Sequence, residues 1–209
     1  MLIGYCEQDY KKLREQMHIP FVVYDGYMES SGKLVNIEID HFDGGVQVGR
    51  YLKNRGHRAV LCVSDNDICM DRERFMGLKS EISSAELMII PMEQEARTLF
   101  YMEHLAEIKK HSAVFAVSDH YAMDLIRFLK SVGISVPKDM SVVGFDDVRE
   151  SEKFVPALTT IKQDYWQRAA LAVRMLNRLR NGDCRDPNVK LPVTLIERDS
   201  VCDVKLHKD

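Results

Sequence analysis

A short apolar run followed at once by two acids constrains most strongly what this chain can fold into. Residues 140–145 (MSVVGF) carry two neighbouring valines, and the run is too short for a helix. We interpret it as a buried strand. Asp146 and Asp147 follow directly, at the carboxyl end of that strand, where open α/β sheets place their ligand crevice. An alternative interpretation is that both acids merely cap the next helical turn.

Similar strands alternate with helical segments along the whole chain. The predicted strands are residues 2–5, 20–24, 34–39, 58–64, 87–91, 113–117, 140–145 and 158–162, and residues 187–197 give two more short extended runs. The predicted helices are residues 9–17, a segment between Asp40 and Gly56, and residues 70–82, 93–110, 118–132 and 164–180. Polar or glycine residues mark many of the helix ends. Ser118 and Asp164 are suited to cap helix starts, while Gly56, Gly133 and Gly182 are suited to helix ends.

This order predicts an α/β fold with parallel sheets flanked by helices. Three extended crossovers, near residues 36–40, 158–163 and 191–196, predict two lobes joined by three strands. We assign residues 1–39 and 162–190 to a partial N-terminal subdomain. Residues 40–161 and 191–209 form the predicted C-terminal subdomain. Helical spacing further predicts that Leu99, Met102 and Trp166 face a core.

Charge and cysteine usage exclude several classes of protein. The net charge of −3 leaves no electrostatic footprint for nucleic acid, so this chain alone should not bind DNA tightly. Five cysteines without C-x-x-C spacing indicate neither a disulfide framework nor a zinc site, and they fit a reducing cytoplasm. The sequence shows no secretory signal and no apolar run near the ~20 residues of a membrane helix. We expect a cytoplasmic protein without metal or cofactor.

Several separated motifs together resemble one protein family. VPKD at residues 136–139, VVGFDD at 142–147 and PALTTIKQD at 156–164 occur in the order and spacing of the effector-binding core of the LacI/GalR family of bacterial transcription regulators. The glycine pair Gly44–Gly45, the run L-x-x-x-G-H-R at residues 52–58 and the R-x-x-G motif from Arg74 to Gly77 extend this resemblance along nearly the whole chain. The glycine pair is not a phosphate cradle, because no G-x-G-x-x-G or Walker lysine occurs.

The resemblance implies a two-lobed, periplasmic-binding-protein-like domain. In that family a helix-turn-helix domain, a hinge and the first part of the N-terminal subdomain precede the sequence equivalent to Leu2. We therefore expect this chain to lack the DNA-binding domain and to have an incomplete N-terminal lobe. Such a lobe would leave strand edges and apolar faces uncovered. The isolated chain is then expected to aggregate or to depend on a partner.

The resemblance also implies five effector-binding residues: Asp25, Arg74, Ser118, Asp119 and Asp146. Asp25 and Asp146 would accept hydrogen bonds from ligand hydroxyls, and Ser118 with Asp119 would orient the ligand at a helix start. Arg74 could fork two N–H donors onto a carboxylate, a phosphate or a vicinal diol. A solvated helix arginine is the alternative for Arg74.

Two departures from the family pattern affect the expected ligand. Ser118 replaces an asparagine, and Met92 stands near the position where family members often have an aromatic ring. The effector is expected to be a sugar or sugar derivative, with a sugar phosphate or a nucleobase also considered. The intact protein is expected to form a homodimer and to contact operator DNA only through the missing domain.

Two other function classes share features of this sequence. A sugar-binding protein for transport or chemosensing shares the same lobes, but the absence of a signal peptide and the VVGFDD motif favour a regulator. Paired carboxylates could also serve a hydrolase as acid and base. Adjacent aspartates on an extended backbone point to different sides, and no G-x-S-x-G or H-E-x-x-H motif occurs. We therefore predict that the chain is not an enzyme.

Overall fold

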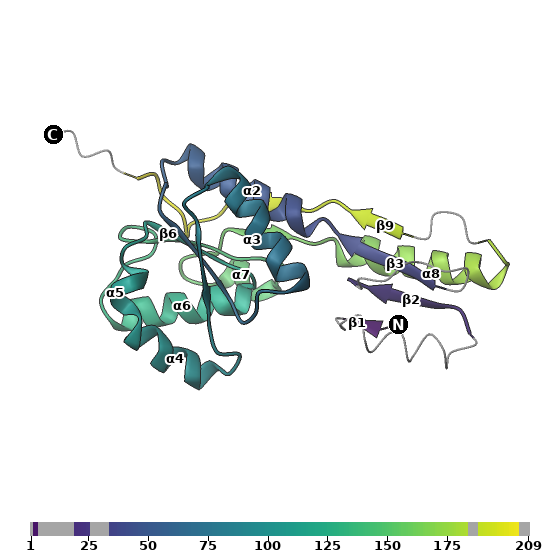
Figure 1. The fold of residues 1–209 in the computed structure, drawn as a ribbon, viewed down its shortest axis with the longest axis horizontal. Helices are drawn as coiled ribbons and strands as arrows, with labels where there is room; N and C mark the ends of the chain where they lie inside the picture. The colour runs from purple at the N-terminus through teal and green to yellow at the C-terminus, as the bar shows by residue number, and fades with distance from the viewer. Residues whose placement is uncertain (1, 4–18, 26–33, 184–187, 205–209) are drawn as a thin grey trace. The chain divides into compact units, whose positions relative to one another are not determined.

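The computed structural model describes residues 2–3, 19–25, 34–183 and 188–204. The predicted helix at residues 9–17 lies outside the described residues. The chain divides into two compact units, labelled by element in Figure 1. Unit 1 combines Met1–Asp40 with Gln163–Val193, and unit 2 combines His41–Lys162 with Thr194–Asp209. The chain therefore passes three times from one unit to the other.

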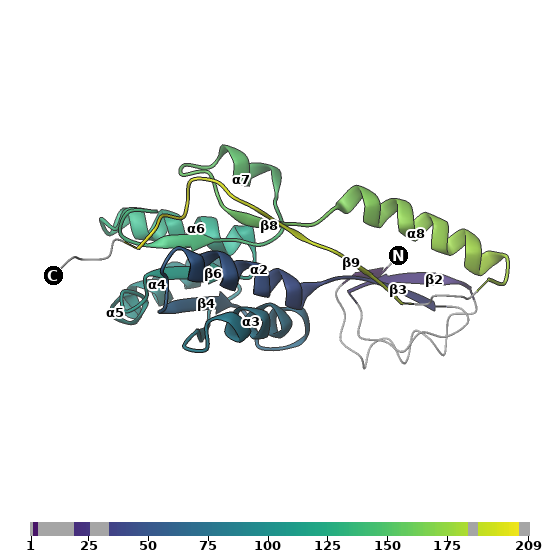
Figure 2. The ribbon, with the colours of Figure 1, turned by 90° about the horizontal axis from the view of Figure 1, so that it is seen from above.

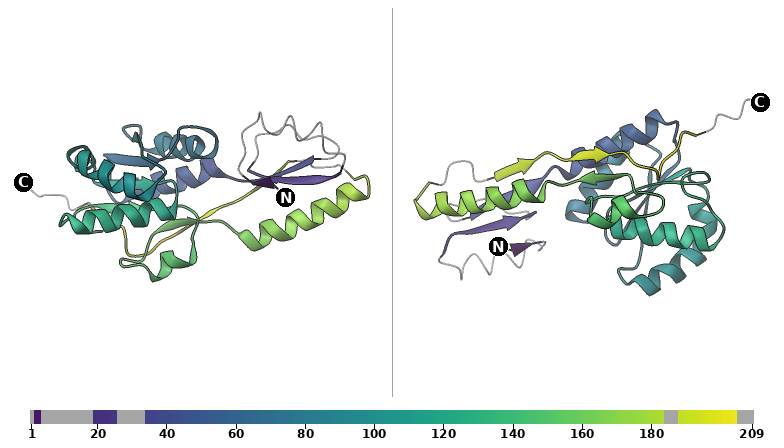
Figure 3. Two further views of the ribbon diagram at one scale, coloured as in Figure 1. Left: turned by 90° about the horizontal axis from the view of Figure 1, so that it is seen from below. Right: turned by 180° about the vertical axis from the view of Figure 1, so that it is seen from behind.

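Unit 1 contains a parallel sheet and one long helix. Its strand order is β1 (Leu2–Ile3), β2 (Phe21–Tyr24), β3 (Leu34–Ile39) and β9 (Asn188–Leu191), with every neighbouring pair parallel. Helix α8 (Tyr165–Arg180) contacts β2 and β3 and runs along one face of this sheet, as Figures 2 and 3 show. The predicted cap at Asp164 is confirmed, since its carboxylate accepts from the Gln167 backbone N–H at 2.8 Å.

The face that α8 buries differs from the one predicted. Arg168, Ala172, Met175 and Leu179 are the buried residues of this helix, and they repeat at helical spacing. Trp166 is 85% exposed, so its predicted place in the core is wrong. Each residue advances about 100° around a helix, and Trp166 precedes Arg168 by two positions, which turns it to the opposite side.

Unit 2 is built on a second parallel sheet. Its strand order is β5 (Glu86–Ile89), β4 (Val60–Ser64), β6 (Ala113–Ala116) and β7 (Ser141–Val143). Helices α2 (His41–Asn54) and α3 (Cys69–Glu81) pack on each other at one face, and α4 (Gln94–Glu103) and α6 (Asp119–Ser131) cover the other (Figure 2). A short antiparallel pair joins β8 (Thr160–Lys162) and β10 (Thr194–Ile196). The predicted fold class is confirmed.

The predicted helix at residues 93–110 is broken into two. Helix α4 ends before His104 and α5 (Leu105–Ile108) follows it, while a further short helix, α7 (Arg149–Lys153), was not anticipated. Leu99 and Met102 are exposed, so their predicted burial is wrong. The buried residues of α4 are Arg97 and Tyr101. Leu99 lies two positions from each of them and therefore faces the opposite side of the helix.

The crossing of α2 and α3 depends on two glycines. A Cβ atom added at Gly45 would fall well inside contact distance of the Arg74 carbonyl oxygen. A Cβ atom at Gly77 would collide in the same way with the Phe42 carbonyl oxygen. Both obstacles are backbone atoms of the facing helix, which cannot move aside as a flexible side chain could. The two helices therefore approach each other at a distance that only glycine permits.

We expect Gly77→Ala to destabilise the protein by about 1–3 kcal/mol, because the added methyl overpacks the crossing. Helix propensity alone would act in the opposite direction, by about 1 kcal/mol. Urea unfolding measures the difference. Met76→Ala, at an exposed position on the same helix, serves as the control. A Gly77→Ala protein at least as stable as the wild type would contradict this account of the crossing.

Candidate functional site

Polar side chains gather where the strands of the unit 2 sheet end. Asp65 follows β4, Ser118 lies two residues beyond β6, and Asp146 lies three residues beyond β7. The strands are parallel, so their carboxyl ends share one edge of the sheet. Ligands of open α/β sheets bind outside this edge. The edge is therefore the candidate site in unit 2.

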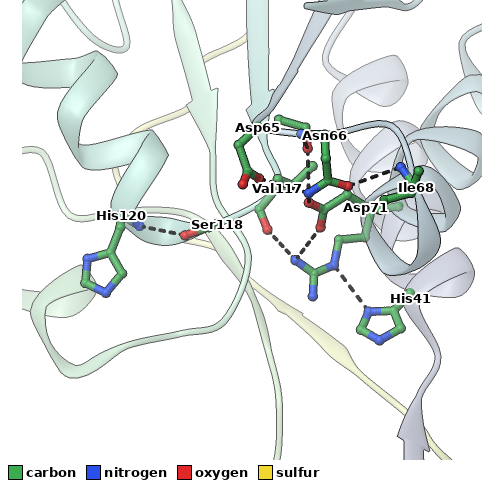
Figure 4. Close-up of polar contacts among 10 residues, drawn as sticks. His41, Asp65, Asn66, Ile68, Asp71, Val117, Ser118 and His120 are labelled. Atoms are coloured by element: carbon green, nitrogen blue, oxygen red, sulfur yellow. Dashed lines mark hydrogen bonds and ion pairs between the residues drawn. The ribbon is translucent and has the colours of Figure 1, made fainter. Parts of the chain in front are cut away.

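Arg74 is buried on α3 and is held by contacts from several elements. Its Nε donates to Nδ1 of His41 at 3.2 Å, and its Nη1 donates to the Val117 carbonyl at 2.5 Å. Nη1 also lies 3.5 Å from Oδ1 of Asp71 (Figure 4). The guanidinium carbon sits 3.8 Å from the centroid of the Phe145 ring. The alternative interpretation of Arg74 as a solvated surface arginine is wrong.

Among the residues that the structure describes, Nη2 of Arg74 has no hydrogen-bond partner. The other guanidinium nitrogens are engaged, so the side chain is fixed before any ligand arrives. A fixed donor costs less conformational entropy on binding than a mobile one. The arrangement can therefore present N–H groups from Nη2 to a ligand oxygen at the sheet edge.

Ser118 and Asp119 take different positions at the start of α6. The Ser118 hydroxyl accepts from the His120 backbone N–H at 3.2 Å, which confirms the predicted cap (Figure 4). Asp119 is fully buried, and its backbone N–H donates to the Phe145 carbonyl at 2.8 Å. The contact of Asp119 with an effector stays a prediction.

The Asp119 carboxylate joins three segments of unit 2. Its Oδ2 accepts from the Val148 backbone N–H at 2.9 Å and from the Ser151 hydroxyl at 2.7 Å. Its Oδ1 accepts from the Thr160 hydroxyl at 2.5 Å. Burial raises the pKa of this carboxyl, and the three hydrogen bonds oppose that rise by stabilising the charged form. Asp119 thus holds the loop before α7, α7 itself and β8 in place.

Replacing Asp119 by alanine should lower the unfolding free energy by about 2–4 kcal/mol, since two buried donors and one partly buried donor lose their acceptor. Urea unfolding monitored by circular dichroism would test this. Asp67→Ala removes an exposed carboxylate from the same unit and should change stability by less than about 0.5 kcal/mol. Equal effects of the two substitutions would contradict the role of Asp119 in linking α7 and β8 to the start of α6.

Asp25 ends β2 in unit 1 and forms an ion pair with Arg168 of α8. Its backbone has φ +49°, a left-handed conformation that few residues other than glycine adopt. Oδ1 of Asp25 also accepts from the Ile39 backbone N–H at 3.3 Å. Arg168 in turn lies 4.4 Å from the Tyr24 ring centroid. The predicted role of Asp25 in ligand binding remains a prediction.

Asp146 and Asp147 both have positive φ, +123° and +56°. The backbone N–H of Asp146 donates to the Ile161 carbonyl at 2.8 Å, which joins this turn to β8. The Asp147 carboxylate accepts from Nη2 of Arg198 at 2.6 Å. Neither acid caps α7, which begins after Val148 without a side-chain cap, so the capping interpretation is wrong.

Sequence reasoning missed three neighbours of Arg74. Asp71 could have been found, because residues three apart on a helix lie side by side. His41 lies thirty-three positions away and comes from α2, and Phe145 was assigned only to a strand. No pattern in the sequence links these two side chains to Arg74.

Within the described part of the chain, no group of three or more His, Cys, Asp or Glu side chains could hold a metal ion. No helix among those residues is both long and apolar enough to span a bilayer.

A parallel sheet with polar side chains at its carboxyl edge is the arrangement in which open α/β domains bind their ligands. Residues 50–201 match the family described as "Periplasmic binding protein-like domain". The chain belongs to this family and is an effector-binding domain of the LacI type of transcription regulator.

Relatives in sequence are transcriptional repressors. The chain is 33% identical over 217 residues to the "HTH-type transcriptional repressor PurR" of Escherichia fergusonii, covering 97% of this chain and 62% of that protein. It is 31% identical over 204 residues to the PurR of Erwinia tasmaniensis, covering 91% of this chain and 59% of the relative. The chain thus spans about three fifths of these relatives. The prediction that it is not an enzyme agrees with them.

Solved structures support the same family. A LacI family transcriptional regulator from Enterococcus faecalis V583 with bound ribose has a TM-score of 0.86 and 26% identity, covering 98% of this chain and 78% of that one. The lac repressor dimer bound to operator and the anti-inducer ONPF has a TM-score of 0.81 and 25% identity, covering 96% and 73%. The family resemblance found in the sequence is confirmed.

Proposed function

We propose that this chain senses a small polyhydroxylated effector, a sugar or sugar derivative, for a transcription repressor. The prepositioned guanidinium of Arg74 at the sheet edge is the observation that carries the proposal. The similarity to a regulator that binds ribose supports it. Nη2 of Arg74 donates to a ligand hydroxyl, and Asp146 and Ser118 complete the contacts in unit 2.

Asp25 is proposed as the ligand contact from unit 1, as the family resemblance implies. In this proposal Asp119 acts by holding the start of α6 and the turn before α7, rather than through a bond to the ligand. The three donors that occupy its oxygens favour this role.

The effector acts by binding two conformations of the protein with different affinity, which shifts their populations. In this proposal DNA is bound by another part of the regulator, because the net charge of −3 gives this chain no overall attraction to phosphates. The complete regulator works on operator DNA in the cytoplasm. In a gel shift with operator-sized duplexes, this chain alone is expected to show no specific complex.

A thermal-shift screen against neutral sugars, sugar phosphates and nucleobases tests the ligand proposal. A ligand of the native state must raise the melting temperature by mass action. Arg74→Ala should weaken binding about tenfold to hundredfold, because a hydrogen bond from a charged donor contributes about 1.5–3 kcal/mol. Arg72→Ala, at an exposed site two residues away, should leave binding unchanged. A ligand that binds Arg74→Ala as tightly as wild type would contradict the assignment.

We also propose that the protein forms a homodimer through the outer face of α4. Leu99 and Met102 are 66% and 59% exposed there. Contiguous exposed apolar side chains mark interaction surfaces. The similar lac repressor is described as a dimer.

Leu99→Glu should convert a dimer into a monomer in sedimentation velocity, because dimerisation would bury the new charge without a partner. Met76→Glu places the same charge at an exposed methionine of α3 and should leave the dimer intact. Dissociation by both variants, or by neither, would rule out α4 as the interface.

A further inference from the structure

Arg74 has too few available nitrogens to form a bidentate hydrogen bond with an anion. A bidentate bond to a carboxylate or phosphate uses two neighbouring guanidinium nitrogens. Nε already donates to His41, and Nη1 donates to the Val117 carbonyl. Only Nη2 lacks a partner among the described residues. A single nitrogen suits a hydroxyl oxygen better than the two oxygens of an anion.

The charge of Arg74 is also balanced by a carboxylate of its own helix. Oδ1 of Asp71 lies 3.5 Å from Nη1, and both side chains are largely buried. Oδ2 of Asp71 accepts from the Ser64 hydroxyl at 3.0 Å and from Nδ2 of Asn66 at 2.9 Å. Burial raises the pKa of Asp71, and the Arg74 charge opposes that rise. These contacts fix the Asp71 carboxylate beside the arginine.

Further negative charge lies close by. The side chains of Asp65, Asn66 and Asp71 gather beside Val117 in Figure 4. Burial raises the pKa of Tyr121 to about 12, and the Asp65 charge contributes to that rise. An anionic ligand at Nη2 would thus meet an arginine whose charge is already balanced by Asp71, and the Asp65 carboxylate belongs to the same cluster through Asn66. Like charges near each other disfavour a complex.

We propose that Asp71 determines specificity by neutralising Arg74, so that the site accepts an uncharged polyhydroxylated ligand and rejects its phosphorylated form. The inference rests on the proposed function, because it selects among the ligand classes which that function allows. Of the ligand groups that an arginine could bind, an uncharged hydroxyl fits both the single available nitrogen and the balanced charge.

Titration with inorganic phosphate, followed by ³¹P NMR at constant pH and ionic strength, tests the role of Asp71. Wild type should show no saturable binding up to about 10 mM phosphate, so its dissociation constant for phosphate is expected to exceed that concentration. Asp71→Asn should bind phosphate at least tenfold more tightly than wild type. The gain should vanish in Asp71→Asn/Arg74→Ala. Asp67→Asn removes the same charge from an exposed site and should behave as wild type.

Two results would overturn the inference. One is saturable phosphate binding by wild type that Arg74→Ala abolishes. The other is a gain in Asp71→Asn no larger than in Asp67→Asn. A melting curve of each variant without phosphate verifies that the protein is folded.

A second titration with ribose and ribose 5-phosphate separates this inference from the sensor proposal. If wild type binds ribose 5-phosphate more tightly than ribose, the proposed role of Asp71 in specificity is wrong, while the sensor proposal still stands. If no neutral sugar binds, while Asp71→Asn still gains phosphate through Arg74, the role of Asp71 stands and the sugar-sensor proposal fails.

Discussion

Helices α2 and α3 touch through their backbones, and the organisation of unit 2 follows from that contact. Gly45 faces the carbonyl of Arg74, so the crossing fixes the main chain of the very residue that reaches the sheet edge. The same helix, α2, supplies His41 to the Arg74 guanidinium. The crossing of α2 and α3 therefore both stabilises unit 2 and positions Arg74. Substitutions at the glycines should alter ligand binding as well as stability, although neither glycine touches the site.

Asp119 gives a second example of a side chain that acts at a distance. A buried carboxylate is costly unless every oxygen is engaged, and Asp119 meets that condition with three donors. Gly144 passes so close to it that an added Cβ would collide with Oδ1. This close packing holds the turn in which Asp146 and Asp147 adopt positive φ. The buried Asp119 and its close contact with Gly144 thus determine the geometry of this turn.

The sequence predicted the fold well because strands and helix ends depend on local chemistry. Gly56, Gly133 and Gly182 all have positive φ, as their positions after helices predicted. The errors at Leu99 and Trp166 have one cause. In each case a nearby buried arginine, Arg97 or Arg168, occupies the inner face of the helix, and hydrophobic periodicity assigns arginine to solvent.

The candidate site was only partly predictable. Arg74 was found through its motif, whereas its partners come from α2 and from the residues that follow β6 and β7. Such contacts join residues that are far apart in the sequence, and they exist only after the chain has folded. Asp71 is the exception, since its spacing from Arg74 places both on one helical face.

The spacing of Asp71 and Arg74 has a consequence for the proposed sensor, which exchanges between two conformations. The bonds from Arg74 to His41 and Val117 cross between elements, so a shift of α3 would stretch or break them. Asp71 and Arg74 lie on the same helix, and any rigid displacement carries both together. The pairing of these two charges therefore survives a rigid displacement of α3. In the proposed sensor both conformations would then exclude anions equally, and the conformational change would respond to the shape of the ligand and not to its charge.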